Sequence, residues 1–525
     1  MSVERIESYV EGRWMAGAHE GQALLNPATE ETIATADSSG IDLANAVAYA
    51  RNEGGAALGA LTFRARGVLL SKLTAELSQK RELLIDSAMK NGGATRGDAK
   101  FDVDGAIGTL AAYAKLAEDL PDTKILADGP GAQLGRSPRF FGQHVFLPRA
   151  GVAVFVNAYN FPAWGFAEKA ACALLAGMPI MVKPATATAH TAYLMARVLI
   201  DSGIAPRGSV SFIAGAAHDL VDHLGSQDVL AFTGSAATGR KFLGKRNIVE
   251  QRVPVNIEAD SLNSAVLGSD VDLGSECFSL FVKDVVRDVT QKTGQKCTAI
   301  RRVMVPEGRI DDVSQELSGR FAELKVGNPA LSEVGMGPLV SRTQLSDVRA
   351  GVTLLREDAD LVFGAPDAPV EALGAPAGKG FFHPIIVLRA RDAHGAARVH
   401  SHEVFGPVVT LLSYSGHPEE AIALVRRGEG SLVSSIYSDD RKFTEAMVLG
   451  IAPFHGRIYL GSGKVADHTL GPGTVLPLSV HGGPGRAGGG EELGGLRGVL
   501  HFMQRTALQG YRPVLEAISG QKASD

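Results

Sequence analysis

The sequence has few cysteines, no long hydrophobic run and no excess of positive charge. Its 525 residues contain 3 cysteines, an odd and sparse set that excludes a disulfide-stapled fold and is typical of reduced thiols in a cytoplasmic protein. The longest apolar run extends only from Ala170 to Val182 and contains Pro179, whereas a membrane-spanning helix needs roughly 20 residues. The first residues also lack the basic start and apolar core of a signal peptide, so we expect a cytoplasmic protein with no membrane partner.

Charge and composition are those of a folded protein with several domains. Lys and Arg number 52 against 57 Asp and Glu, a net charge of -5, so no basic face for nucleic acid is evident. Hydrophobic residues at 45% and charged residues at 21% argue against disorder. At roughly 150 residues per domain, the length predicts two to four domains. Glycine is in excess, with 62 residues, which indicates tight turns or backbone close to a ligand.

The residue pattern predicts an α/β protein. Residues 1–125 have mainly helical spacing, with Thr62 as the N-cap of a helix that carries Leu70, Leu73 and Leu77 on one face. From residue 151, short β-branched runs alternate with helical stretches, which is the signature of a parallel, doubly wound sheet. The five predicted strands begin near Gly151, Pro179, Val210, Val229 and Val253.

A second alternation of strands and helices, over residues 300–461, predicts a second α/β domain. Two more strand-like stretches, 132–148 and 499–506, are far apart in sequence but can pair into an arm that joins subunits. The glycine-rich stretch 482–495 is expected to be a loop. We expect a cofactor-binding domain at 1–128 and 150–261, a catalytic domain at 262–475, and a bridging oligomerisation arm at 129–149 and 476–525.

Cys297 is the first candidate for chemistry. It lies in Thr293-Gly-Gln-Lys-Cys-Thr-Ala, where Lys296 and other polar or permissive neighbours are compatible with a thiolate stabilised by a cation or by backbone N–H groups. A cysteine chosen at random is more often a small buried hydrophobe. Cys172 and Cys277 have apolar sequence neighbours, as expected for buried cysteines without a catalytic role.

Other candidates follow predicted strands, at the edge where open α/β sheets bind ligands. Glu258 ends a strand, although a solvated turn carboxylate is the simpler interpretation of that residue alone. Asn160 follows another strand, where its amide either belongs to an Asn-Phe-Pro turn or donates to an oxyanion. Gly234 and Ser235 open a helix that can hold a pyrophosphate, but Arg240 stands where a P-loop needs Lys.

Six short motifs occur in the order and spacing of one known family. They are Asn-Phe-Pro at 160–162, Lys-Pro at 183–184, Phe-Thr-Gly-Ser at 232–235, Glu258, Gly-Gln-Lys-Cys at 294–297, and Glu-Val-Phe-Gly-Pro at 403–407. On these motifs the chain resembles the aldehyde dehydrogenase superfamily over residues 60–510. The resemblance implies an aldehyde dehydrogenase-like fold and a nicotinamide cofactor, with no metal.

The resemblance also implies a role for each matching residue. Cys297 would attack the aldehyde, Asn160 would hold the oxyanion, and Glu258 would activate the water that hydrolyses the resulting thioester. The implied cofactor contacts run from the adenosine ribose to the nicotinamide, at Lys183, Thr186, Gly234, Ser235, Glu403 and Phe405.

The sequence departs from the family pattern at two places. The family commonly has Glu-Leu-Gly-Gly around its base, whereas this chain has Glu258-Ala-Asp-Ser-Leu-Asn, so we expect a differently shaped loop. Many NAD-preferring members place Glu three residues after the Lys of Lys-Pro, where this chain has Thr186. Because a carboxylate there would repel a 2′-phosphate, its absence predicts NADP as the preferred cofactor, with NAD as the second candidate.

Further stretches resemble one branch of the superfamily. Asn91-Gly-Gly-Ala-Thr-Arg-Gly-Asp and Gly294-Gln-Lys-Cys-Thr-Ala-Ile-Arg-Arg are similar to segments of enzymes that oxidise CoA-linked semialdehydes during the catabolism of aromatic acids. The resemblance implies a CoA-linked semialdehyde from benzoate degradation through benzoyl-CoA as the substrate, and a homodimer or larger homo-oligomer as the assembly. No cluster of Lys and Arg marks a site for the phosphates of CoA.

Three other functions stay open at this point. A CoA-acylating dehydrogenase would pass the thioester to a thiol rather than to water, and Glu258 argues against it. A catalytically silent homologue that serves for binding or structure would not need Cys297, Asn160 and Glu258 together. A thiol hydrolase would need a His beside its Cys and would leave Lys183 and Glu403 unexplained.

Overall fold

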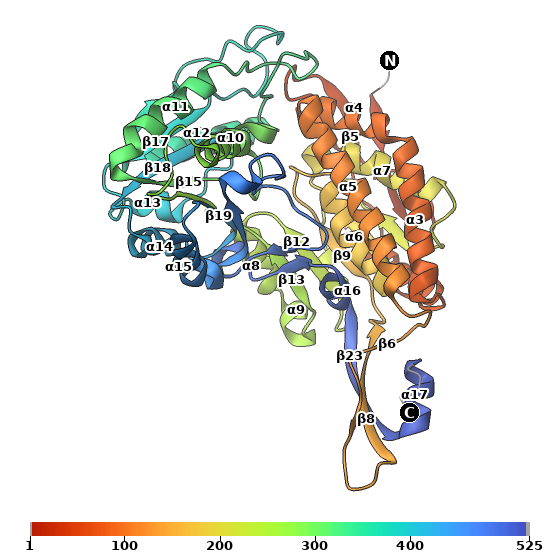
Figure 1. The fold of residues 1–525 in the computed structure, drawn as a ribbon. Helices are drawn as coiled ribbons and strands as arrows, with labels where there is room; N and C mark the ends of the chain where they lie inside the picture. The colour runs from red at the N-terminus through yellow and green to blue at the C-terminus, as the bar shows by residue number, and fades with distance from the viewer. Residues whose placement is uncertain (1–2, 521–525) are drawn as a thin grey trace.

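The computed structural model describes residues 3–520 as two α/β lobes and a protruding arm (Figure 1). The arm extends away from both lobes, and the C-terminal helix α17, Arg512–Ser519, lies beside it. Within residues 3–520, the helices are all too short or too polar to cross a membrane.

The first lobe contains a seven-stranded sheet with the order β13-β12-β9-β10-β11-β2-β3. Its five parallel strands are β9 (Ala153–Val156), β10 (Ile180–Lys183), β11 (Val210–Phe212), β12 (Val229–Thr233) and β13 (Val255–Glu258). These strands confirm the parallel sheet predicted from the β-branched runs. Their carboxyl ends therefore lie along one edge, where ligands of open α/β sheets bind.

Helices cover both faces of this sheet, because alternate residues of each strand point to opposite sides. Phe155 and Val182 belong to the core shared with α6 and α7, whereas Val154 and Met181 belong to a separate core on the other face. The connecting helices are α6 (Trp164–Ala176), α7 (Ala189–Asp201), α8 (Ala236–Leu243) and α9 (Arg246–Gln251). This two-sided burial makes the sheet doubly wound, as predicted.

The prediction of a mainly helical N-terminal region is wrong for residues 4–36. Five short strands lie there, β1 (Glu4–Ile6), β2 (Ser8–Val10), β3 (Arg13–Met15), β4 (Gln22–Leu25) and β5 (Thr32–Ala36). β2 and β3 extend the first sheet in antiparallel pairing, and the other three form a small sheet of their own. Strands this short carry too few residues for an alternating pattern to be recognised.

The rest of the N-terminal region is helical, as predicted. Thr62 is the N-cap of α3, and its Oγ1 accepts a hydrogen bond of 3.2 Å from the Ala65 N–H. The helices are α1 (Leu43–Tyr49), α2 (Gly55–Gly59), α3 (Phe63–Gln79), α4 (Arg81–Gly92) and α5 (Arg96–Leu116). Of these, α3 and α5 pack with α6 in the larger core of the first lobe.

The second lobe is built on another seven-stranded sheet, with the order β16-β17-β18-β15-β14-β19-β20. Five strands confirm the second predicted alternation, β15 (Arg302–Pro306), β17 (Ile386–Ala390), β18 (Val408–Tyr414), β19 (Ser431–Tyr437) and β20 (His455–Gly461). β14 (Ser264–Leu267) and the antiparallel edge strand β16 (Ala359–Phe363) were not predicted. Its longer helices are α10 (Glu276–Thr290), α11 (Ile310–Ala322), α12 (Arg342–Leu355), α14 (Pro418–Arg426) and α15 (Arg441–Ile451).

The arm confirms the predicted pairing of two strands far apart in sequence. β8 (Phe140–Pro148) pairs antiparallel with β23 (Met503–Tyr511), while β6 (Leu126–Ala127) and β7 (Ala132–Gln133) flank β8. The predicted strand from 499 begins too early, because Leu496–Leu500 form the helix α16.

The sequence predicted that the glycine-rich stretch is a loop, and this prediction is only partly correct. Two short antiparallel strands bound it, β21 (Val480–Gly482) and β22 (Glu491–Leu493). Their side chains His481 and Glu492 are buried, so this hairpin contributes to the interior of the protein.

Candidate active site

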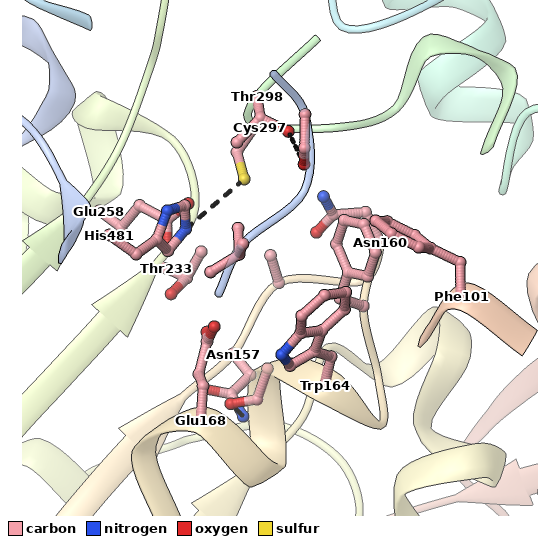
Figure 2. Close-up of a pocket in the computed structure, with 15 residues that line it drawn as sticks. Phe101, Asn157, Asn160, Trp164, Glu168, Thr233, Glu258, Cys297, Thr298 and His481 are labelled. Atoms are coloured by element: carbon pink, nitrogen blue, oxygen red, sulfur yellow. Dashed lines mark hydrogen bonds and ion pairs between the residues drawn. The ribbon is translucent and has the colours of Figure 1, made fainter. Parts of the chain in front are cut away.

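Cys297, Glu258 and Asn160 line one small cavity between the two lobes (Figure 2). Glu258 is the last residue of β13, Asn160 lies between β9 and α6, and Cys297 precedes β15. The cavity has a volume of about 40 Å³, enough for a few water molecules. Residues far apart in sequence therefore meet where strand ends of the first lobe face a loop of the second.

The loop that carries Cys297 has a tightly fixed backbone. Lys292, Thr293 and Gly294 all have left-handed φ angles, of 51°, 57° and 68°. At Gly294 a side chain is also excluded by space, because a Cβ atom would lie 2.2 Å from the carbonyl oxygen of Gly406. The Thr293 hydroxyl donates to the Gly337 carbonyl at 2.9 Å. These constraints fix the direction in which Cys297 leaves the loop.

The unusual segment after Glu258 holds the Cys297 loop. The side-chain amide of Asn263 donates to the carbonyl oxygens of Cys297, at 2.7 Å, and Ala299, at 2.9 Å. Asp260 accepts a hydrogen bond of 3.0 Å from the Ala236 N–H at the start of α8. The expected difference in loop shape thus has a physical basis, because this segment connects the candidate base, the candidate nucleophile and a helix N-terminus.

The Cys297 side chain is a protonated thiol, not a thiolate, at neutral pH in this structure. Burial, followed by the nearby Glu258 carboxylate, raises its pKa well above the usual range. Lys296, its neighbour in sequence, does not offset this effect, because its Nζ donates to Asp288 and Gln291, each at 2.8 Å. The expected thiolate stabilisation by an adjacent cation is therefore not supplied by Lys296.

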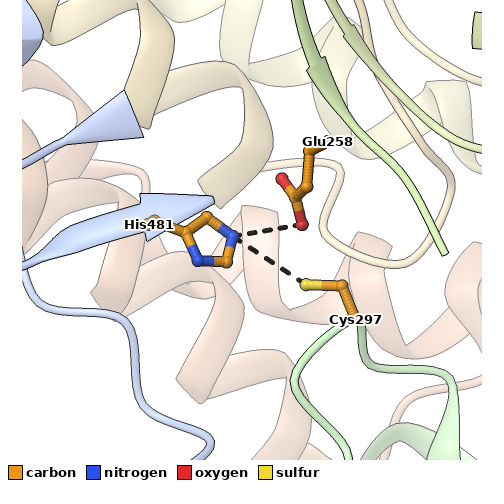
Figure 3. A group of neighbouring side chains, drawn as sticks. All are labelled: Glu258, Cys297 and His481. Carbon is orange, nitrogen blue, oxygen red and sulfur yellow. Dashed lines mark hydrogen bonds and ion pairs between the residues drawn. The ribbon is translucent and has the colours of Figure 1, made fainter. Parts of the chain in front are cut away.

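His481 is a site residue that the sequence did not reveal (Figure 3). Its Nε2 lies 3.1 Å from Glu258 Oε1 and 3.9 Å from Cys297 Sγ. The side chain is 4% exposed and stands on β21, inside the stretch expected to be a loop. Its only sequence signal is its place directly before the glycine-rich segment.

Glu258 is ionised at neutral pH despite being buried. Burial alone would raise its pKa, but the His481 imidazole beside it, and then Lys169, hold that pKa well below the usual range. Glu258 in turn raises the pKa of His481 against the opposing effect of burial. Their contact therefore favours the ion pair of a carboxylate and an imidazolium.

A second group of buried charges lies behind Glu258. Lys169 Nζ contacts Glu168 Oε1 at 2.7 Å and Glu492 Oε2 at 3.0 Å. Asn256 donates to the other oxygen of Glu492 at 2.9 Å. Burial raises the pKa of Glu492 to about 7. No local pattern indicated this cluster, because Lys169 interrupts the apolar run of α6 and its carboxylate partner Glu492 is far away in the chain.

Asn160 is buried, with 7% of its surface exposed, and lines the same cavity as Cys297. Its side-chain amide points into that cavity (Figure 2). A polar side chain in this position can donate a hydrogen bond to an oxygen bound beside the sulfur.

A larger groove adjoins the small cavity. Its volume is about 860 Å³, and Gly234, Ser235, Glu403 and Phe405 line it. Ser235 is the N-cap of α8 and accepts a hydrogen bond of 3.3 Å from the Thr238 N–H. Helix N-termini of this kind bind phosphate groups through their free N–H groups.

Lys183 and Thr186 are not among the residues that line this groove, although Ala185 between them is. Lys183 ends β10, and burial lowers its pKa. Thr186 begins a 3₁₀ turn, and its hydroxyl donates to the Gly215 carbonyl at 3.4 Å. Both residues therefore lie near the groove without bordering it directly.

Glu403 has an unused acceptor inside the protein. One carboxylate oxygen accepts from the Ser261 N–H at 3.1 Å, whereas Oε1 is buried without a hydrogen bond and lies 3.5 Å from Arg301 Nε. Burial raises the pKa of Glu403 to about 7. The guanidinium of Arg301 also lies 5.3 Å from the centre of the Phe405 ring. Arg301 is thus a further site residue that the sequence argument missed.

The two cavities share part of their walls. Asn157, Ala158, Asn160, Thr233, Glu258 and Cys297 border both of them. An aldehyde joined to Cys297 would therefore lie next to a ligand in the groove. The Glu258 carboxylate and the Asn160 amide would lie near its carbonyl carbon. This arrangement can support attack by sulfur, transfer of hydride to a neighbouring group and hydrolysis of the product.

The sequence profile of the Aldehyde dehydrogenase family matches residues 14–505. A similar curated protein is 3,4-dehydroadipyl-CoA semialdehyde dehydrogenase of Aromatoleum evansii, which is 45% identical over 480 residues, 91% of this chain and 93% of that protein. The profile match includes the parallel strands of both lobes and ends inside β23 of the arm.

Solved structures show the same fold. Lactaldehyde dehydrogenase from Escherichia coli superposes with a TM-score of 0.84 at 24% identity, covering 97% of this chain and 99% of that one. A betaine aldehyde dehydrogenase variant from Staphylococcus aureus, solved in complex with NAD+, has a TM-score of 0.84 at 21% identity and covers 96% and 97%.

Proposed function

This chain belongs to the aldehyde dehydrogenase family, and on that premise we propose that Cys297, Glu258 and Asn160 carry out the NAD(P)-dependent oxidation of an aldehyde to a carboxylate. The observation that carries the proposal is the cavity these residues share, which opens into the nucleotide-sized groove. Incubating the protein with NADP and a panel of aldehydes, while following the reduced cofactor, tests it.

The groove suits a nicotinamide nucleotide. Oε1 of Glu403 and Oγ1 of Thr233 are among the buried oxygens beside it that lack hydrogen bonds, and an N-capped helix begins at Ser235. We assign the pyrophosphate to Gly234 and Ser235, the nicotinamide ribose to Glu403, the ring to Phe405, and the adenosine ribose to Lys183 and Thr186. When bound, the cofactor accepts a hydride.

The proposed reaction has two halves. The Cys297 thiolate attacks the aldehyde carbon, and Asn160 donates a hydrogen bond to the resulting oxyanion. Loss of hydride from that carbon leaves a thioester on Cys297. Glu258 then takes a proton from water, which attacks the thioester and releases the carboxylate and the thiolate. Water fits this scheme, because the cavity between these residues has room for it.

Replacing Asn160 by Ala should lower kcat by about 10²- to 10³-fold, since one preorganised oxyanion donor is lost. Single-turnover measurement of cofactor reduction checks this. The rate at which iodoacetamide alkylates Cys297 should stay within about twofold of the original, because the Asn160 amide acts on the oxyanion. Slow alkylation would instead indicate a displaced Cys297 loop.

We propose NADP as the preferred cofactor, because Thr186 lacks the carboxylate that would repel a 2′-phosphate. Thr186→Glu should lower kcat/KM for NADP relative to NAD by about tenfold or more, because the added carboxylate would repel the 2′-phosphate. Initial rates with both cofactors test this. A clear preference of the unchanged protein for NAD would contradict the proposal.

We propose that the substrate is a CoA-linked semialdehyde of benzoate catabolism, 3,4-dehydroadipyl-CoA semialdehyde. The support is the 45% identity to an enzyme named for that substrate. The free semialdehyde without CoA serves as the control substrate, and its kcat/KM should be lower. Analysis of the product separates this function from CoA acylation, since hydrolysis through Glu258 gives the free acid at the semialdehyde carbon.

His481 changes the case for a thiol hydrolase, because a His does lie beside Cys297. That function still leaves the groove unexplained, together with the buried Glu403 oxygen that accepts no hydrogen bond. We also propose that residues 1–128 and 150–261 bind the cofactor, that 262–475 contribute the nucleophile, and that the arm at 129–149 and 476–525 joins two or more copies of the chain.

A further inference from the structure

Three reactive side chains converge at the base of the small cavity. The nearest ligand atoms of Glu258, Cys297 and His481 all lie within 4.8 Å of one another. Nε2 of His481 is the atom in contact with both partners, at 3.1 Å from the carboxylate and 3.9 Å from the sulfur (Figure 3). His481 does not border the nucleotide groove.

The proposed reaction places a difficult demand on this site. Its first half needs a thiolate at Cys297, and its second half needs a carboxylate at Glu258. Both groups are buried, and two anions this close repel each other strongly where water cannot screen them. Burial, and then the Glu258 carboxylate, raise the pKa of Cys297, so both disfavour the thiolate that the reaction needs.

We propose that His481 is a positioning residue whose imidazolium holds the Glu258 carboxylate and offsets its charge, so that the Cys297 thiolate forms beside it. This inference rests on the proposed function for its purpose, and on the contacts of Nε2 for its physical basis. His481 itself keeps its proton throughout. Its role is electrostatic, through the ion pair with Glu258.

The charge balance shows what His481 contributes. With a thiol, a carboxylate and an imidazolium, the three side chains have no net charge. When the thiol proton passes to water in the cavity and on to solvent, the net charge becomes -1. With a neutral residue at position 481, the same step would take the group from -1 to -2, which is less favourable in a buried site.

The surroundings favour the protonated form of His481. Glu258 on β13 has its Oε1 3.1 Å from Nε2 of His481, and Glu168 on α6 and Glu492 on β22 add negative charge nearby. Lys169 on α6 is the opposing cation, but it is in contact with Glu168 and Glu492. The carboxylates around the imidazole thus outnumber the cation.

The experiment measures the ionisation of Cys297 directly. The rate of alkylation of Cys297 by iodoacetamide, followed by mass spectrometry of its peptide, is determined as a function of pH in the full-length protein. In His481→Gln, which keeps a neutral hydrogen-bond donor, the midpoint should rise by at least about one pH unit, so alkylation below it is about tenfold slower. In Glu258→Gln the midpoint should fall.

His455→Asn is the matched control. His455 is also buried, but its Nδ1 donates to the Ile451 carbonyl at 2.8 Å, and Asn can replace that bond. Its alkylation profile should equal that of the original protein. Circular dichroism and NADP affinity establish that each variant is folded, and the affinity should not change in His481→Gln.

An unchanged alkylation midpoint in folded His481→Gln would overturn the inference, and so would a downward shift. Because alkylation needs no turnover, this result is independent of whether the protein oxidises aldehydes. In an active protein, kcat of His481→Gln should recover as the pH is raised, whereas a merely structural defect would lower kcat equally at every pH.

Discussion

Replacing Cys297 by Ala should abolish aldehyde oxidation, with a fall in kcat of about 10⁴-fold or more, while NADP binding is nearly unchanged. The sulfur is the proposed point of covalent attachment, and no other side chain in the cavity can take its place. The groove keeps its volume of about 860 Å³ and its lining residues, of which Cys297 is only one. Cofactor affinity, measured by fluorescence titration, should stay within about twofold.

Cys277→Ala is the matched control for this experiment. Cys277 is a buried residue on α10, and burial first, then nearby carboxylates, raise the pKa of its thiol to about 12. Its replacement should leave kcat unchanged, because it lies outside both cavities. Loss of cofactor binding together with activity in Cys297→Ala would indicate structural damage, and substantial remaining turnover would contradict the assignment of the nucleophile.

The sequence was sufficient to predict the parallel sheet and the pairing of the arm. Strands such as Ala153–Val156 are buried on both faces and consist almost entirely of β-branched and aromatic residues. The residues at their ends, Glu258 and Asn160, could be placed at the ligand-binding edge by the general rule for such sheets. That local information predicted the sheet and the position of these two candidate site residues.

The remaining site residues depend on contacts that no local pattern encodes. His481 contacts Cys297 although the two residues are 184 positions apart in the sequence. Its strand has only three residues and is followed by glycines, so the sequence did not indicate a strand there. Arg301 and Lys169 have the sequence context of buried strands and helices, and their partners Glu403 and Glu492 come from distant segments. Such side chains become recognisable only when the tertiary structure shows which buried charges are paired.

Replacing Glu258 by Gln should separate the two halves of the reaction. The amide has nearly the same shape but cannot accept the proton of the attacking water, so hydrolysis of the thioester should slow by about 10²- to 10⁴-fold. Attack by Cys297 should persist, because removing this carboxylate also removes a charge that raises the pKa of the thiol. Rapid mixing with NADP and aldehyde should therefore give a burst of about one reduced cofactor per subunit, followed by slow turnover.

The burst experiment also distinguishes the proposed hydrolysis from transfer to CoA. Mass spectrometry after the burst should find the acyl group on the Cys297 peptide. Adding free CoA should leave the slow phase unchanged if water is the natural acceptor, whereas a CoA-acylating enzyme would resume fast turnover. Glu491→Gln is the matched control, because Glu491 is an exposed carboxylate next to the buried Glu492 and pairs with Arg497. Fast steady turnover by Glu258→Gln without CoA would mean that another group, such as Glu168 at the same cavity, activates the water.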